Sequence, residues 1–145
     1  MPPSVVVDAS VLVSAFLFPG SIPGLVIEEA KRGSCALHVS PILIEEVGRS
    51  LLNRRLRERY RHSEENVAAW CRRLAEIGSV LATPLADIPL VCRDPDDHHV
   101  IAAAVAAFAS YIVTGDKDLL ELGTYQAVRI VTARAFLEGL RGSPI

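Results

Sequence analysis

The sequence predicts an α/β fold with three layers, in which a parallel sheet of about five strands lies between two layers of helices. Short runs rich in β-branched residues, typical of buried strands, recur at 4–8, 35–40, 79–83, 110–114 and 127–132. Stretches with helical patterning separate them, at 10–18, 25–32, 41–52, 64–77, 95–109, 119–122 and 133–140. Strands that alternate with helices are joined by right-handed crossovers, which produce a mostly parallel sheet covered on both faces.

The chain has 145 residues, which fits a single domain spanning 1–145. Half of the residues are hydrophobic and 22% are charged, a composition that excludes a disordered chain. The longest apolar run, 100–109, is too short to cross a bilayer, and the N-terminus lacks the basic region of a secretory signal. We therefore expect a cytoplasmic protein without a membrane segment.

Three cysteines, Cys35, Cys71 and Cys92, are scattered along the chain without CxxC spacing. An odd number of isolated cysteines argues against a disulfide framework and against a zinc ribbon. The pattern favours buried thiols in a reducing compartment.

Charged residues are segregated although the net charge is only −2. The segment 49–61 holds six arginines and one acid, Glu58, whereas acids gather in short clusters at 45–46, 94–97 and 116–118. This distribution is consistent with an acidic pocket beside a basic surface. A solvated helix face explains the arginines equally simply, and the charge pattern alone favours that interpretation.

Two of the predicted strands end in an acid. Asp8 closes the strand at 4–8, and Asp116 follows the strand at 110–114. Ligands of open α/β sheets bind outside the carboxyl ends of the strands. Two carboxylates at the same sheet edge repel each other, and a divalent cation would remove that cost.

The segment RDPDDHHV, 93–100, begins a predicted helix. Asp94 has the position of an N-cap, because the residue before a proline avoids helical geometry and Pro95 suits the first helical position. Asp96 then points sideways towards solvent. Asp97 would be the third helical residue, and acids at the N-cap and at this position resemble a capping box at the positive end of the helix dipole. This structural explanation accounts fully for Asp94 but less well for Asp97.

Asp97 also lies on the apolar stripe of that helix. The stripe comprises Val100, Ile101, Ala104, Val105 and Phe108. Asp97 should therefore point inward, where an unpaired carboxylate is costly. His98 lies at the edge of the stripe and His99 on the opposite side, so the two cannot both face a pocket with Asp97 and a histidine-based zinc site is improbable. His99 is expected at the surface, and the role of His98 stays open.

The remaining acids have structural explanations when they are taken singly. Thr114 and Asp116 have the positions of helix caps, and Asp118 would favour the same helix dipole. Ser40 and Pro41 begin another helix, which carries Glu45 and Glu46. A helical wheel favours Glu45 as the inward acid, or places both in solvent.

Four segments, taken in order, resemble the PIN-domain family. They are VVVDASVLVSAF, SPILIEEV, DPDDHHVIAAAVAAFASYIVTGDKDLL and VRIVTARAFL. The resemblance is closest to the PIN-type ribonucleases of prokaryotic toxin–antitoxin systems. It covers nearly the whole chain, and 53–89 is its least diagnostic part. No single motif is specific, but the ordered set is.

The resemblance implies an acidic catalytic site and a five-stranded parallel sheet. The catalytic residues would be Asp8, Glu46, Asp97 and Asp116, with Asp8, Asp97 and Asp116 as metal ligands. Ser10 and Thr114 would orient the carboxylates, and Asp118 would support them from outside the ligand set. The family register selects Glu46, where the helical wheel favours Glu45.

The resemblance also implies a cofactor, a substrate and partners. All-oxygen ligands select hard cations, here Mg²⁺ or Mn²⁺. The substrate would be RNA, and Arg49, Arg54 and Arg55 would contact its backbone or an acidic partner. Relatives of the toxin type pair with a small antitoxin and form homodimers.

Two other functions are compatible with part of the pattern. A non-catalytic PIN module for binding or assembly would keep the same acids, because an intact acid set is necessary for cleavage but not sufficient. Phosphotransfer enzymes also place an aspartate at a strand end. The D-x-D pattern of haloacid dehalogenases is absent, since Ala9 and Ser10 follow Asp8, and a receiver needs an aspartate where Thr83 and Pro84 stand.

Overall fold

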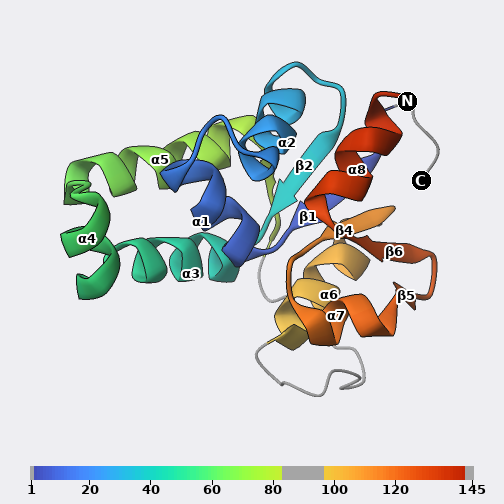
Figure 1. Cartoon of the computed structure of the whole chain (residues 1–145). Helices are drawn as coiled ribbons and strands as arrows, with labels where there is room; N and C mark the ends of the chain where they lie inside the picture. The colour runs from blue at the N-terminus through green and yellow to red at the C-terminus, as the bar shows by residue number, and fades with distance from the viewer. Residues whose placement is uncertain (1, 83–96, 143–145) are drawn as a thin grey trace.

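The computed structural model describes residues 2–82 and 97–142 (Figure 1). The strands are β1 (Ser4–Val7), β2 (Ala36–Val39), β3 (Ser79–Val80), β4 (Tyr111–Val113), β5 (Thr124–Tyr125) and β6 (Val128–Val131). The helices are α1 (Ala9–Leu17), α2 (Ile22–Lys31), α3 (Pro41–Leu51), α4 (Arg54–Tyr60), α5 (Glu64–Ile77), α6 (His98–Ala106), α7 (Lys117–Leu122) and α8 (Ala133–Leu140).

The sheet has the strand order β3-β2-β1-β4-β6-β5. Five strands run parallel, and β5 pairs with β6 in the antiparallel direction. The central strand β1 is fully buried at Val5, Val6 and Val7, as a run of β-branched residues covered on both faces should be. The predicted α/β class and parallel sheet are confirmed, and the two-residue strand β5 is an addition.

Helices cover both faces of this sheet. In Figure 1, α2 and α8 lie on one side of the strands, and α6 and α7 lie on the other. On the first side, α1 packs against α2 and α3, and α2 packs against α8. On the second side, α6 packs on β1, β2 and β4, and α7 packs on β6. The three-layer arrangement predicted from the alternation of elements is therefore present.

Helix α6 explains the apolar run that follows the acidic segment. Its residues from Val100 to Ala104 are all buried, so the helix is apolar nearly all round and not only along a stripe. The helix ends at Ala106, and Phe108 has a positive φ of 52° and is 91% exposed. The prediction that Phe108 belongs to the buried stripe is therefore wrong. The predicted N-cap Asp94, the predicted first helical residue Pro95 and the predicted solvent-facing Asp96 lie outside the described residues.

One helix was not predicted from the sequence. Helix α4 spans most of the arginine-rich segment and has no buried residue, so it lacks the apolar stripe by which helices are found. It joins α3 to α5 at the outer end of these helices, away from β4 and β6 (Figure 1). The arginines are thus carried on a solvated helix and its flanks.

The cysteines with described positions are free thiols. Cys35 is buried, and burial, together with the charge of Glu29, raises the pKa of its thiol to about 11. Cys71 is half-buried, and burial raises its pKa as well. Both therefore remain protonated at neutral pH and are poor metal ligands. Cys92 lies outside the described residues.

Among the described helices, none is by itself long and apolar enough to cross a membrane. Only α1 and α2 taken together reach that length and composition, and they are bent by 96°.

Gly24, in the first turn of α2, lets the backbone of Pro19 in the loop between α1 and α2 approach closely, and replacing it by alanine is expected to destabilise the fold. An added Cβ would lie 2.6 Å from the carbonyl carbon of Pro19, and backbone cannot move aside cheaply. The higher helix propensity of alanine favours the substitution by up to about 1 kcal/mol, but overpacking typically costs about 1–3 kcal/mol. We expect a net loss of about 2 kcal/mol in urea unfolding.

Gly20 provides the control, because nothing lies within 4 Å of a Cβ added there. Gly20→Ala should change the unfolding free energy by less than about 0.5 kcal/mol. Equal stability of the two variants would contradict the close approach at Gly24.

Candidate active site

The site begins where two neighbouring strands end. Strands β1 and β4 are paired in parallel with Val7 opposite Val113, so the residues that follow them lie side by side. Asp8 follows β1, and Thr114 begins the loop that leads from β4 to Asp116. Hydrogen bonds that continue the sheet fix the backbone of both residues. Asp8 N donates to the Val113 carbonyl at 2.9 Å, and Thr114 N donates to the Val131 carbonyl at 3.0 Å.

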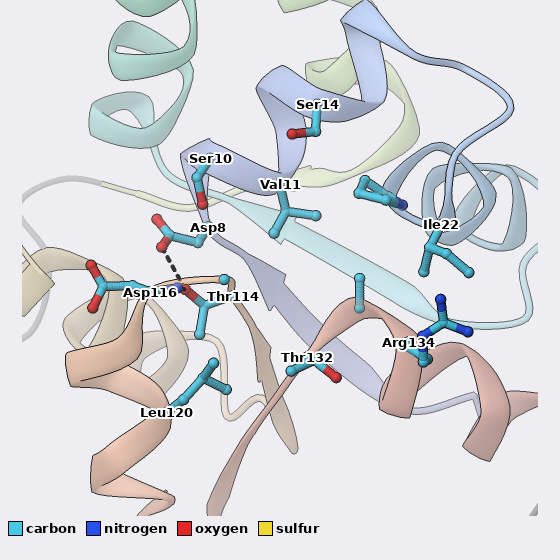
Figure 2. A pocket seen from close by; sticks show the side chains of 13 residues that line it. Asp8, Ser10, Val11, Ser14, Ile22, Thr114, Asp116, Leu120, Thr132 and Arg134 are labelled. Carbon is cyan, nitrogen blue, oxygen red and sulfur yellow. Dashed lines mark hydrogen bonds between the residues drawn. The ribbon is translucent and has the colours of Figure 1, made fainter.

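Thr114 connects the two acids. Its buried hydroxyl donates to Asp8 Oδ2 at 2.7 Å and accepts from the backbone N–H of Asp116 at 3.0 Å (Figure 2). Asp8 is itself only 8% exposed, and its Oδ1 accepts from Ala9 N at 2.7 Å. A buried carboxylate with both oxygens hydrogen-bonded has a fixed orientation. Thr114 therefore holds Asp8 and the backbone of Asp116 by hydrogen bonds, and it is not the cap of α7.

Asp116 is the N-cap of α7. Its Oδ1 accepts from Asp118 N at 2.8 Å and from Leu119 N at 3.2 Å. The structural explanation considered from the sequence is thus correct for Asp116. The capping bonds also fix the orientation of the Asp116 carboxylate, which lies near Asp8.

Three carboxylates converge at this edge. One oxygen each of Asp97, Asp116 and Asp118 lies within 4.8 Å of the others, and all three residues are partly buried. Asp97 immediately precedes α6, and its side chain makes no capping bond to that helix. An all-oxygen donor set of this size fits a hard divalent cation. Asp118, expected outside the ligand set, belongs to this group, whereas Asp8, expected as a ligand, does not.

A pocket of about 590 Å³ opens beside Asp8 and Asp116. Helices α1 and α2, the loop after β4, α7 and the start of α8 form its walls. The polar residues that line it are Asp8, Ser10, Ser14, Thr114, Asp116, Thr132 and Arg134. In Figure 2 the hydroxyl of Ser10, a predicted supporting residue, lies next to the Asp8 carboxylate.

Glu46 lies against His99. His99 Nε2 and Glu46 Oε1 are 2.8 Å apart, and their side chains are 15% and 29% exposed. Glu45 instead points to solvent and pairs with Arg49 at 3.3 Å. The helical wheel was wrong about Glu45, and it was also wrong to place His99 at the surface. The pair joins α3 to the first turn of α6, two residues after Asp97.

The amino-acid sequence of the chain matches a known family. A family model of the PIN domain matches residues 4–118, which is more than half of the chain. The chain belongs to the PIN-domain family. It is also 33% identical over 118 residues to MJ1680, an uncharacterized protein of Methanocaldococcus jannaschii. That alignment covers 81% of this chain and 74% of the relative.

PIN domains are generally nucleases, and they typically use divalent metals. The four predicted catalytic acids, Asp8, Glu46, Asp97 and Asp116, all lie inside the matched segment of this PIN domain. The fold therefore places an acidic cluster, whose carboxylate oxygens suit a divalent metal ion, within the segment matched by the PIN-domain model.

The predicted contact arginines of the PIN domain lie apart from its pocket. Arg49, at the end of α3, pairs with Glu45, and Arg54, on α4, pairs with Glu58 at 2.9 Å. Arg55 is exposed on α4. None of the three lines the pocket. Any contact that they make with a substrate is therefore to a part remote from the acids.

Sequence reasoning missed two residues near the site. The first is His99, whose partner Glu46 lies 53 residues away on another helix, so that no local pattern reveals the pair. Arg134, at the start of α8, lines the pocket but lies outside the segment matched by the family model. It is one of 15 basic residues and has no distinguishing neighbours in the sequence.

Proposed function

We propose that this PIN domain is a metal-dependent endoribonuclease that hydrolyses RNA phosphodiester bonds, and that it is the toxin of a toxin–antitoxin pair. The observation that carries the proposal is the convergence of Asp97, Asp116 and Asp118 beside the buried Asp8. Four acids from three separate parts of the chain repel one another, and such an arrangement is stable when it serves a cation.

Asp97 and Asp116 would hold Mg²⁺ or Mn²⁺ directly, with Asp8 as a ligand on the β1 side and Asp118 completing the group. The chemistry of the donors fits either ion, because both prefer carboxylate oxygen. When bound, the ion supplies neutralisation of phosphate charge and activation of water for attack on phosphorus.

The residues of the chain itself supply orientation and a proton acceptor. Thr114 donates a hydrogen bond that orients the Asp8 carboxylate, and Ser10, whose hydroxyl lies next to that carboxylate, would support it. Glu46 would accept a proton from the attacking water, and His99 donates a hydrogen bond that fixes the Glu46 carboxylate. Water adds to phosphorus while the bond to the leaving sugar oxygen breaks, and that oxygen takes up a proton.

Arg49, Arg54 and Arg55 would bind the RNA backbone or an acidic partner beyond the pocket. Phe18 supports a protein partner at this surface, because it is 47% exposed and packs edge-to-face against Tyr60 of α4. An antitoxin with acidic and apolar side chains would fit such a surface. The proposal includes a homodimer and a cytoplasmic location, and the free thiols of Cys35 and Cys71 are consistent with a reducing compartment.

The test is cleavage of an end-labelled, single-stranded RNA by the purified protein, with Mn²⁺ or Mg²⁺ and with EDTA. We expect cleavage only with the metal ions. Asp116→Asn, purified in the same way, reports any contaminating ribonuclease.

Calorimetric titration with Mn²⁺ on the same preparation separates the alternatives. Metal binding without cleavage of any RNA offered would identify a non-catalytic PIN module. Transfer of a phosphoryl group to Asp8 would identify a phosphotransfer protein. Either result would overturn the ribonuclease proposal.

A further inference from the structure

The pocket has two ends of opposite charge. Among the described residues, Asp8 and Asp116 are the only acids that line it, and they lie together at one end. Arg134 is the only basic residue within 2–82 and 97–142 that lines it, and Figure 2 shows its guanidinium across the pocket from the two acids, beside Ile22. In the part of the chain that the structure describes, Arg134 forms no ion pair.

Arg134 stands on a rigid support. It is the second residue of α8, whose N-cap Thr132 accepts from Ala135 N at 3.1 Å. Two residues further along α8, Phe136 is buried and packs against Tyr111 of β4 with ring centroids 5.4 Å apart. Because α8 follows β6 directly, the sheet fixes the position of the Arg134 backbone. The Arg134 side chain lines the pocket without a carboxylate paired to it.

An apolar wall lies between the two charged ends. Val11, Ile22, Pro23 and Leu120 contribute to it. The volume of about 590 Å³ lies within the range of pockets that hold small ligands. Across the pocket, the acids are followed by the apolar wall and then by the unpaired arginine. This spatial order suits a ligand in which apolar and anionic groups alternate, as they do along a nucleotide chain.

We propose that Arg134 binds a phosphate group of a single-stranded nucleic acid, next to the phosphate at the acidic end. This inference rests on the proposed function, which places the reacting phosphate at the acids. The intervening nucleoside contacts the wall of Val11 and Ile22. Guanidinium is suited to this task because it offers two parallel N–H donors to phosphate oxygens. A single strand is required, since a base paired in a duplex cannot turn to such a wall.

Binding of a labelled single-stranded oligoribonucleotide, followed by fluorescence anisotropy in EDTA, tests the assignment without cleavage. Arg134→Ala should raise Kd about fivefold, the effect of losing one solvent-accessible, charge-assisted hydrogen bond. The slope of log Kd against log salt should fall by about 0.7, as for one lost phosphate contact on a single strand. Arg134→Lys should retain the salt slope and recover part of the affinity.

Arg141 provides the matched control. It is an exposed arginine next to the C-terminal end of the same helix, and it does not line the pocket. Arg141→Ala should bind like the wild type. Equal affinities and salt slopes for the Arg134→Ala and Arg141→Ala proteins would overturn the assignment, and so would failure of the wild type to bind the RNA.

Cleavage kinetics separate this inference from the proposed function. With Mn²⁺, Arg134→Ala should raise KM and leave kcat nearly unchanged, because the guanidinium lies away from the reacting atoms. Arg134-dependent binding without any cleavage would retain the phosphate site and remove the ribonuclease. Cleavage with an unchanged KM would retain the ribonuclease and remove the phosphate site.

Discussion

Replacing Asp116 by asparagine is expected to lower RNA cleavage by at least about a hundredfold. Changing groups that merely orient ligands of a metal costs about 10–100-fold, and Asp116 belongs both to the carboxylate cluster and to the pocket. Asparagine retains an oxygen that can accept from Asp118 N and Leu119 N, so α7 keeps its cap. The loss should therefore appear in kcat/KM and in Mn²⁺ affinity, with little change in the unfolding curve.

Two further variants separate charge from folding. Asp116→Ala removes the cap as well, and it should lose about 1 kcal/mol of stability in addition to activity. Glu138→Gln neutralises an exposed acid of α8 away from the cluster and should behave as the wild type. Activity of the Asp116→Asn protein within a few-fold of the Glu138→Gln protein would show that Asp116 does not take part in cleavage.

Replacing Thr114 by valine is the second large effect that we expect. Valine has nearly the same shape but leaves Asp8 Oδ2 without its donor and Asp116 N without its acceptor. Thr114 is only 1% exposed, so water cannot easily replace the hydroxyl. Unfolding in urea should show a loss of about 2 kcal/mol, the cost of unsatisfied buried polar groups. The affinity for Mn²⁺ should fall about tenfold or more, because Asp8 loses its orientation.

Thr114→Ser keeps the hydroxyl and removes only a methyl group. Its Mn²⁺ affinity should stay close to that of the wild type, and its stability should fall by only about 1 kcal/mol, as for other small buried deletions. If valine and serine at 114 gave the same metal affinity, the hydroxyl would have no positioning role.

The parallel sheet was predictable because its strands are short β-branched runs that the helices cover on both faces. The central residues Val5, Val6 and Val7 illustrate this, since all three are fully buried. Helix α4 and strand β5 were not predictable. The first has no buried residue, and the second has two residues held by pairing with β6, so neither has a local pattern.

The acids at the strand ends were predictable for a topological reason. Carboxyl ends of adjacent parallel strands share one edge, which brings Asp8 and Asp116 together whatever the details of packing. The choice of Glu46 could not come from a wheel. A wheel gives directions around one helix, whereas Glu46 is turned inward by His99 on another helix. Arg134 could not be predicted for the same reason, because it lines the pocket only as a result of where α8 packs in the fold.

The central claim is that acids distant in sequence form one site for a divalent cation. A crystal structure of the protein in Mn²⁺, with anomalous diffraction recorded near the manganese absorption edge, tests it most directly. We predict an anomalous peak among the carboxylates of Asp97, Asp116 and Asp118, on the side that faces Asp8. The absence of a peak at saturating Mn²⁺, or a peak only at acids elsewhere on the surface, would contradict the claim.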